Sequence, residues 1–554
     1  MARCSTNGPV KKYLHHDRDY DLLNPMSMHT TPSEENTSTA ELLVQLQAHN
    51  AALQQELKRT QLERDHYKLQ LSVRIRALYA ARSEARATHQ RDLFFNEAEA
   101  QVTVAPATTK TVHVSAHAKK KPGRKPLDAL LPREIIRHEL PEAQRVCAHD
   151  GSVLTEIGVE VSEQLDITPA ILSVVRHERV KYACPCCDNT IKTAPAPKKL
   201  IDKGLLTENA LAWVVTSKYQ DALPLYRQAT LLNRFGGDIV RHTLANNIVQ
   251  LGGAVQPLIN RLRDTLCDAD LIYGDETTLQ VLKENGRRAQ QKSYLWVQCS
   301  GSDPPIRLFT YAPLHNAATA RDLYEDMRGA LMSDGYEVYD QIAQQNALVH
   351  LACWAHARRK FIEAEAALPK QARTPDHPAT QMLRLIGELY AVEKHARERA
   401  QDNDNDREQR HAIMRQARRA HSVAIIDRIQ AHLLGHLHST APQPPLGRAL
   451  HYLHGQWPKL IRFLDNGAYP LDNNLAENAI RPFVIGRKNW LFCDSVHGAK
   501  ASANLYSLIE TAKANGLEPY FYLAHLFREL PNATTLDDIE KLLPWKVQLP
   551  TVNR

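Results

Sequence analysis

The sequence predicts a multidomain α+β protein with a mixed β-sheet at its core, and three observations lead to this prediction. The chain has 554 residues, more than a single hydrophobic core usually holds. Strand-like segments are confined to two stretches, residues 163–184 and residues 269–352. Much of the remaining sequence has helical periodicity, including a highly charged stretch over residues 357–465. Helix-rich and strand-rich segments therefore belong to several consecutive domains.

The composition indicates a largely globular chain that could bind nucleic acid. Hydrophobic residues make up 43% and charged residues 24%, as in ordinary globular proteins. The net charge of +7 permits a DNA partner without establishing one. Nine cysteines, three of them clustered at positions 184, 186 and 187, indicate metal binding or free thiols, not a secreted disulfide framework. Because no signal segment or apolar run of ~18 residues occurs, we expect a cytoplasmic protein without a membrane span.

The N-terminal part of the chain predicts a disordered segment followed by a coiled coil. Residues 1–38 are polar and rich in Ser, Thr, Asn and Pro, which is typical of disorder. Over residues 39–90, Leu46 and Leu53 recur at heptad spacing, and the offset positions include Asn50 and Leu57. One polar Asn inside an apolar seam often fixes the register of a coiled coil. The alternative is a lone amphipathic helix, but no other apolar partner lies nearby in the sequence.

A basic linker over residues 91–133 follows. Pro122 and Pro126 should keep its centre extended, so that it could lie along a DNA backbone or minor groove. An ordinary solvated charge run explains the pattern equally well. The candidate DNA-binding residues here are Lys119, Lys120, Lys121, Arg124 and Lys125.

Residues 134–198 predict a zinc-ribbon-like DNA-binding domain. Residues 163–184 alternate as two strands around a Thr-Pro turn, and Cys184 and Cys187 form a C-x-x-C pair at the strand end. Upstream, Cys147 has Asp150 where a second C-x-x-C would have cysteine. Zinc accepts thiolate, imidazole and carboxylate ligands, so Cys147, Asp150, Cys184 and Cys187 could complete a site. The alternative is a ribbon that has lost its metal.

Residues 199–268 predict a helical region. Two periodic helices are separated by Gly236 and Gly237, as in a helix-turn-helix motif or a plain helical hairpin. In the first case the second helix would present a set of polar residues to DNA, namely Arg241, His242, Asn246 and Asn247.

The catalytic segment is predicted at residues 269–510. Three strand-like runs in close succession indicate an antiparallel meander, and two further strands are each followed by a helix. The order β-β-β-α-β-α-β-α is that of the ribonuclease-H-like fold. A helical insertion is expected at residues 357–465, and a C-terminal helical segment at residues 511–554.

Three carboxylates are the candidate catalytic residues. Asp275 interrupts one apolar strand, and Asp334 follows another beside Gly335, which we expect to allow a sharp turn. A buried carboxylate needs a cation, and no Lys or Arg is adjacent in the sequence. Glu477 would supply a third oxygen ligand from a helix in "LDNNLAENAIRP", with Asp472 as its N-cap. Hard oxygen ligands favour Mg²⁺ or Mn²⁺ over zinc.

An ordinary role for Glu477 is the competing interpretation, because acids in the first turn of a helix favour the helix dipole. The basic residues just after Glu477 favour the functional interpretation, since they could hold a phosphate backbone. They are Arg481, Arg487 and Lys488.

Several motifs together resemble bacterial insertion-sequence transposases of the DDE class, specifically the "sixty-six" family and its transposase C. The resemblance extends from about Lys119 to the C-terminus. It rests on segments that are each weak alone, including "SEQLDITPA", "YACPCC", "GDETTLQVL", "SDGYEVY", "HLACWAHARRKF" and "LDNNLAENAIRPFVIGRKNWLF".

The resemblance implies that Asp275, Asp334 and Glu477 are the three metal-binding acids of a DNA transposase. Such an enzyme binds the terminal inverted repeats of its element, hydrolyses the ends and joins the freed 3′-OH to target DNA. Cys353 and His356 match a C-x-x-H motif near the start of helical insertions in several DDE transposases. We favour a structural role for these two, because no further ligand is close to them in the sequence.

The implied partners are double-stranded DNA, a second copy of the chain in a dimer or higher oligomer, and accessory proteins of the same element. The implied location is the bacterial cytoplasm, at the nucleoid. Two other functions compete with the transposase: a non-catalytic DNA-binding regulator derived from a transposase, and a ribonuclease-H-like nuclease unrelated to mobility. Retention of all three acids argues against the regulator, and the long N-terminal half argues against the nuclease.

Overall fold

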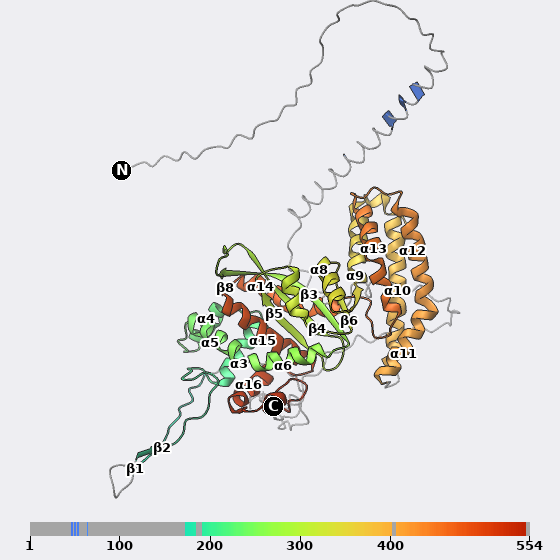
Figure 1. Ribbon diagram of the computed structural model, residues 1–554. Coiled ribbons are helices and arrows are strands. Elements are labelled where there is room, and N and C mark those ends of the chain that lie inside the picture. Colours follow the sequence, from blue (N-terminus) through green and yellow to red (C-terminus); the bar gives the residue numbers. More distant parts are fainter. Residues whose placement is uncertain are drawn as a thin grey trace, which may run out of the picture. The chain divides into compact units, whose positions relative to one another are not determined.

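The computed structural model describes residues 46–47, 49–50, 53–54, 64, 172–183, 191–401 and 406–549 (Figure 1). Contacts divide the chain into two units, Met1–Ala81 and Arg82–Arg554. Every described residue of the first unit is helical, which agrees with the helix predicted there. Pairing of that helix with a second copy stays a prediction. The segments predicted as disordered (1–38) and as a basic linker (91–133) lie outside the described residues.

A short hairpin is the described part of the zinc-ribbon-like segment. β1 (Lys181–Ala183) pairs antiparallel with β2 (Ile191–Thr193). The strand predicted from Ala170 onward is wrong for residues 172–180, which form no strand. Alternation stabilises a strand only where one face can be buried, and Val174 is 92% exposed. The candidate zinc ligands Cys147, Asp150, Cys184 and Cys187 lie outside the described residues.

Four helices lead from the hairpin to the central sheet. Thr207 is the N-cap of the first of them: its side-chain oxygen accepts a hydrogen bond from the backbone N–H of Ala210 (3.3 Å). The third packs against a C-terminal helix so closely that a Cβ on Gly252 would lie 2.3 Å from the Cβ of Ala501. The four are α3 (Glu208–Tyr219), α4 (Leu225–Arg234), α5 (Arg241–Ala254) and α6 (Gln256–Cys267).

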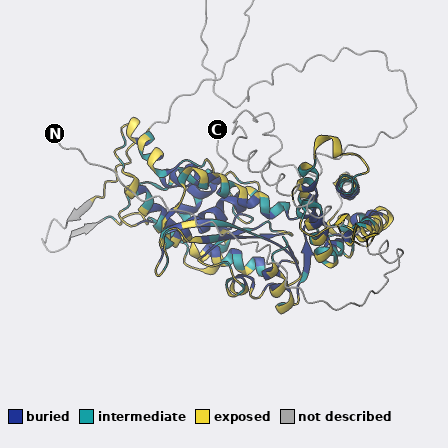
Figure 2. Ribbon diagram, turned by 90° about the horizontal axis from the view of Figure 1, so that it is seen from above, coloured by how far each residue is buried: buried dark blue, intermediate teal, exposed yellow. Residues whose placement is uncertain are grey.

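The central sheet has the strand and helix order that the sequence predicted. Its strands run in the order β5-β4-β3-β6-β7, with the first three antiparallel to one another and β3, β6 and β7 parallel. In Figure 2 these strands are largely buried, with the exposed helix faces outside them. The strands are β3 (Leu271–Lys283), β4 (Lys292–Ser300), β5 (Arg307–Ala312), β6 (Ala330–Ser333) and β7 (Val349–Ala352); the connecting helices are α7 (Ala317–Tyr324) and α8 (Glu337–Gln345).

The long strand β3 has a gap along one edge. Its first residues, 271–273, pair with β6, and its last, Val281 and Lys283, pair with β8 (Cys493–Ser495). Among the described residues no strand pairs with 274–280 on that side. Backbone polar groups left this way need other partners. Helix α14 (Asn474–Trp490) and the residue before it supply these partners. Asn473 donates through Nδ2 to the Gly274 carbonyl (2.9 Å), and Arg487 donates to the Thr278 carbonyl.

The remaining C-terminal helices cover the sheet. α15 (Val496–Ala514) packs on β5 and is buried along most of its length, with Ser507 accepting a hydrogen bond from the Phe309 N–H (2.8 Å). α15 runs through the predicted boundary at residues 510–511, so that boundary does not separate two elements. The last elements are α16 (Pro519–Glu529), η6 (Leu530–Asn532) and α17 (Leu536–Lys541).

The segment between β7 and α14 is a helical bundle with its own core. Trp354, Phe361, Leu389, Ile429 and Leu453 are fully or almost fully buried in it. The bundle comprises α9 (Trp354–Ala367), η3 (Lys370–Ala372), α10 (Pro378–Gln401), α11 (Arg407–Ala417), the π-helical turn η4 (Arg418–Ser422), α12 (Val423–Leu437), α13 (Pro445–Leu460) and η5 (Ile461–Leu464).

Two sets of hydrogen bonds join the end of the bundle to its beginning and to its interior. The Trp354 backbone N–H donates to the Leu471 carbonyl (3.0 Å), and its indole Nε1 donates to the Leu460 carbonyl (2.8 Å). Arg418, 2% exposed, forms a two-point ion pair with Glu393 (2.7 and 2.8 Å). The same guanidinium donates to three carbonyls in the segment leading to α14, those of Phe463, Asn466 and Tyr469.

Candidate active site

Asp275 and Asp334 lie on neighbouring parallel strands, Asp275 within β3 and Asp334 directly after the end of β6. Tyr273 of β3 is opposite Met332 of β6, so each acid comes two residues beyond this pair. The two acids therefore lie side by side where the pairing of β3 with β6 ends, although β3 itself continues to Lys283. The Asp275 Oδ1 accepts a hydrogen bond from the Glu276 N–H, and the Asp334 Oδ1 accepts one from the Tyr336 N–H (both 2.9 Å).

The reason for glycine after Asp334 differs from the one predicted. Gly335 has no positive φ. Instead, a Cβ at this position would lie 2.9 Å from the ring of Tyr452, which comes from α13 of the bundle. Gly335 therefore permits a close approach of the bundle to the acid.

Glu477 is brought to this edge by α14, which fills the gap along β3. The helix begins one residue later than predicted: Asn473 is the N-cap, and Asp472 accepts from the Asn474 N–H (3.2 Å). The Asn473 side chain bonds the residue preceding Asp275, so the start of the helix is fixed to β3. Glu477 therefore stands one turn into α14, close enough to Asp275 for its charge to act on that carboxyl.

The charges of these acids act on one another. Loss of solvation, followed by the charges of Glu276, Glu477 and Asp334, raises the pKa of Asp275 well above its ordinary value. An isolated group in this position would shed its charge, and a bound cation would restore it. The three carboxylates thus form one electrostatic cluster.

Glu276 is a fourth acid that the sequence analysis missed. Its carboxylate accepts a hydrogen bond from Tyr339 (2.6 Å) and pairs with His315 Nε2 (2.9 Å). His315 is stacked on Tyr336, with ring centroids 4.2 Å apart. Burial raises the pKa of Glu276 despite these partners. The signal in the sequence was the adjacent pair Asp275-Glu276, but only the structure shows that the second acid has partners of its own.

Glu477 also contacts the start of α9. Its Oε1 lies 3.5 Å from His356 Nδ1, and its Oε2 lies 3.5 Å from Arg359 Nη2. Ligand atoms of Cys353, His356 and Glu477 all lie within 4.8 Å of one another, the one such group of three found among the described residues. No further ligand is close to Cys353 and His356 in the sequence, but the structure brings Glu477 to them from a helix more than 100 residues away.

Two observations indicate that the cluster of Asp275, Asp334 and Glu477 suits a divalent cation. Glu477 Oε1 is buried and has no hydrogen-bond partner. The raised pKa of Asp275 indicates a carboxyl group short of positive charge. Carboxylate oxygens of this kind suit Mg²⁺ or Mn²⁺.

The candidate DNA-binding residues separate into different environments. Arg241, Arg481 and Lys488 are exposed. Arg487, in contrast, bonds Thr277 and Thr278 of β3, so its guanidinium is engaged inside the protein. The basic strip Lys119, Lys120, Lys121, Arg124 and Lys125 lies outside the described residues.

The helix α5 presents only part of the polar face predicted for it. His242 and Asn246 are not buried, whereas Asn247 is 6% exposed. Asn247 points inward because α5 packs on α15 along the face that also carries Leu244, Ile248 and Leu251. Asn247 is therefore removed from the candidate DNA-contacting residues.

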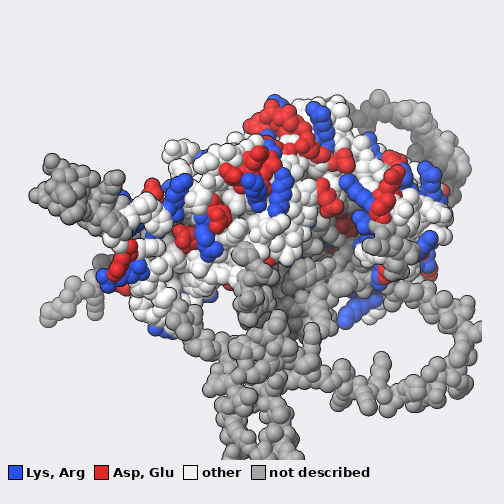
Figure 3. All heavy atoms as spheres, turned by 90° about the horizontal axis from the view of Figure 1, so that it is seen from below, with Lys and Arg blue, Asp and Glu red and all other residues white. Residues whose placement is uncertain are grey.

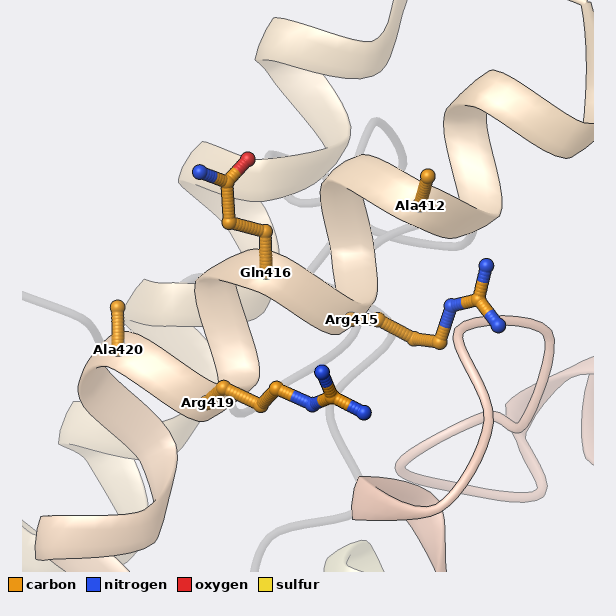
Figure 4. Close-up of a pocket in the computed structure, with 5 residues that line it drawn as sticks. All are labelled: Ala412, Arg415, Gln416, Arg419 and Ala420. Carbon is orange, nitrogen blue, oxygen red and sulfur yellow. The ribbon is translucent and has the colours of Figure 1, made fainter.

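On the face shown in Figure 3, acidic and basic side chains are interspersed, so this face has no continuous basic surface among the described residues. A shallow pocket of about 570 Å³ lies on α11 and η4, where Arg415 and Arg419 extend to the same side (Figure 4). None of its lining residues belongs to the acidic cluster, so the pocket is distinct from the candidate active site.

We expect Asp275→Asn to stabilise the metal-free protein at neutral pH. With a folded pKa above the unfolded one, the native state binds more protons between the two values, and its stability falls as pH rises through that window. The neutral amide removes this loss. Melting temperatures should be measured in the presence of a chelator from about pH 4 to pH 8, which spans the ordinary carboxyl range. The melting temperature of the variant relative to that of the wild type should increase as pH rises.

Asp340→Asn is the matched control. Burial alone would raise the pKa of Asp340, but Lys459 and His350 lower it overall. Its charge therefore favours folding at neutral pH, and the control should melt lower than the wild type there. A lower melting temperature for Asp275→Asn as well would contradict the proposed electrostatic cluster.

Comparison with known families identifies the chain. A family model described as the transposase IS66 family matches residues 203–501, which include all three acids. The chain belongs to the IS66 transposase family. Further models of IS66 transposases match around this region: the zinc-finger binding domain at residues 144–188 and the C-terminal element at residues 507–545. A model described as transposase C of IS166 homeodomain matches residues 66–136. The family is of the DDE type, as the sequence motifs indicated.

Relatives of this IS66 transposase occur in Sinorhizobium fredii (strain NBRC 101917 / NGR234). The uncharacterized protein y4jD is 34% identical over 432 residues, covering 75% of this chain and 81% of its own. The uncharacterized protein y4qI is 31% identical over 453 residues, covering 78% and 80%. In the described part of the IS66 transposase, no helix has both the length and the apolar character of a membrane span.

Proposed function

We propose that this IS66 transposase binds the terminal inverted repeats of its element, cleaves the element ends by metal-assisted hydrolysis and joins each 3′-OH to target DNA. The observation that carries the proposal is the meeting of three acids from distant segments. Asp275 and Asp334 stand on adjacent strands where the pairing of β3 with β6 ends, and α14 brings Glu477 to the same region. Their effect on the pKa of Asp275 supports a shared electrostatic role.

We also propose that the catalytic core is ribonuclease-H-like. The support is the strand order β5-β4-β3-β6-β7, with an antiparallel half followed by a parallel half. In such a sheet, ligands bind outside the carboxyl ends of the parallel strands. Asp334 directly follows the carboxyl end of β6, and Asp275 lies beside it on β3.

In this mechanism Asp275, Asp334 and Glu477 hold Mg²⁺ or Mn²⁺. When bound, the cations supply activation of the attacking hydroxyl and stabilisation of the leaving oxygen. Glu276 adds negative charge beside Asp275 while its own oxygens remain bonded to Tyr339 and His315. In the joining step the 3′ oxygen of the element forms a bond to a target phosphorus, and the bond to the target's own 3′ oxygen breaks.

DNA contacts are proposed on both sides of the catalytic residues. Arg481 and Lys488, exposed on α14, are suited to a phosphate backbone beside Glu477, and Arg241 is suited to one at the start of α5. The zinc-finger match at residues 144–188 supports a DNA-binding role for that segment. Zinc held by Cys147, Asp150, Cys184 and Cys187 remains part of the proposal.

The assembly and location of the protein are also proposals. The heptad segment supports a homodimer or higher oligomer, and Leu46 and Leu53 are at least half exposed on the single chain. DNA as substrate places the protein at the bacterial nucleoid, with accessory proteins of the same element as further partners.

Neutralising the basic strip should weaken DNA binding regardless of sequence. Glutamine at Lys119, Lys120, Lys121, Arg124 and Lys125 removes positive charges that displace counterions from phosphates. The slope of log affinity against log salt should become shallower by about 0.9 for each phosphate that the strip no longer neutralises. Titration of labelled duplexes at several salt concentrations measures this slope, and an unchanged slope would show that the strip does not bind phosphates.

The decisive test of the function is cleavage of end-labelled element DNA by the full-length protein. A transposase should cleave at the element ends only with Mg²⁺ or Mn²⁺ and then transfer the new 3′ ends to a target duplex. A DNA-binding regulator would bind the same ends without cleaving them, which would overturn the proposal in favour of that alternative.

A further inference from the structure

The start of α9 carries two metal-ligating side chains that the proposed reaction does not use. Cys353 immediately follows β7 and is the N-cap of α9, and His356 lies one turn further along the same helix. Spacing of three residues places both side chains on one face. Glu477 of α14 faces them, so three donor atoms of different chemistry converge within 4.8 Å.

Burial raises the pKa of Cys353, so its sulfur is a neutral thiol until a cation displaces the proton. Its side chain is fully buried, and its sulfur accepts a hydrogen bond from the Asn473 backbone N–H (3.2 Å). It also stands at the N-terminus of a 14-residue helix, where the helix dipole favours negative charge. The start of a second helix, α14, therefore helps to hold the sulfur in place.

Two polar atoms in this cluster lack hydrogen-bond partners. His356 Nδ1 and Glu477 Oε1 are both buried, and they face each other at a distance of 3.5 Å. Buried polar atoms are rarely left unsatisfied in folded proteins. A cation between the two would satisfy both, and zinc ligands in a tetrahedral site lie roughly 3.3–3.6 Å from one another, given zinc–ligand bonds of about 2.0–2.3 Å.

We propose that Cys353, His356 and Glu477 form a binding site for a transition-metal dication such as Zn²⁺, with solvent as the fourth ligand. Thiolate and imidazole ligands select such metals over Mg²⁺. The charges balance, because one thiolate and one carboxylate neutralise the dication. Metal binding replaces the proton on the Cys353 sulfur, and that proton passes to solvent.

Because Glu477 also belongs to the acidic cluster with Asp275 and Asp334, a cation bound by Cys353 and His356 would compete with Mg²⁺ for its carboxylate. Zinc is therefore expected to oppose the magnesium-dependent reaction, a consequence that rests on the proposed function. The binding site itself does not rest on that function, so it can be tested without DNA.

The test is a Co²⁺ titration of the full-length protein followed by absorption spectroscopy. Cobalt replaces zinc in such sites, and a thiolate ligand gives a charge-transfer band in the near ultraviolet. The starting protein carries serine at Cys147, Cys184, Cys186 and Cys187, which removes the thiols of the zinc-finger segment. We expect a band that saturates with one Co²⁺ per chain in this protein and no band after Cys353→Ser.

Two further variants make the result decisive. Cys299→Ser alters another fully buried thiol, in β4, and should keep the band. His356→Gln changes a partly exposed side chain and should weaken Co²⁺ binding by at least about tenfold. This variant tests the site even if Cys353→Ser fails to fold. Absence of the band before Cys353 is altered, or its persistence afterwards, would overturn the site. Failure of the DNA-cleavage assay would leave this result intact.

Discussion

Glutamine in place of Glu477 is expected to lower metal-dependent cleavage and strand transfer by orders of magnitude. The substitution keeps the side-chain size and the helix but removes one charged ligand from the acidic cluster. Asp275→Asn and Asp334→Asn should have similar effects, and their combinations should not add, because the three acids act as a unit. Labelled-end cleavage measured beside DNA binding separates the two activities: binding should survive, since carboxylates repel phosphates when no metal is present.

Glu337→Gln provides the control for this substitution. Glu337 is an exposed acid in the first turn of α8, so its loss should leave cleavage unchanged. The ordinary helix-dipole interpretation of Glu477 predicts near-normal cleavage and a stability loss of only about 0.3–1 kcal/mol. Robust cleavage by Glu477→Gln would therefore remove this residue from the active site.

Methionine in place of Arg418 is expected to cost about 3–5 kcal/mol of stability, the range for breaking a buried ion pair. The change leaves Glu393 buried without its partner and removes the donor to three backbone carbonyls. Because those carbonyls lie in the segment leading to α14, the position of Glu477 should loosen as well. Thermal melting reports the first effect and the cleavage rate the second.

The double variant Arg418→Met/Glu393→Leu should recover much of the lost stability, since no buried charge is then left alone. Arg428→Met breaks an exposed pair with Glu388 and should cost at most about 1 kcal/mol. If Arg418→Met and Arg428→Met lower the free energy of unfolding by the same small amount, the buried pair does not stabilise the bundle.

The sheet was predictable from the sequence because its strands carry local signals. The segments that became β3, β4 and β5 are apolar runs bounded by polar turns, and their order with the following helices is confirmed. The meeting of Asp275 and Asp334 follows from the parallel pairing of β3 with β6. The gap along β3 could not be predicted, because it depends on β6 and β8 pairing with different ends of the same strand.

The misplaced roles share one physical cause, which is packing between segments far apart in sequence. Arg487 looked like a phosphate-binding residue until α14 was seen to fill the β3 gap. Asn247 looked exposed until α5 was seen to pack on α15. The contact between His356 and Glu477 likewise joins two helices whose sequences give no sign of each other.

The hydrogen bond from Trp354 to Leu471 has a consequence for how such proteins can vary. The bundle leaves the central sheet and returns to it at one point, so the residues between Trp354 and Leu471 form an insertion with its own core. The entropy of closing a loop grows only slowly with its length, and a longer or shorter insertion would therefore fit the same two attachment points at little cost. Related chains could therefore change the part of the bundle distant from the sheet, provided that the contact of Tyr452 with Gly335 and the bonds of Arg418 to the segment before α14 are kept.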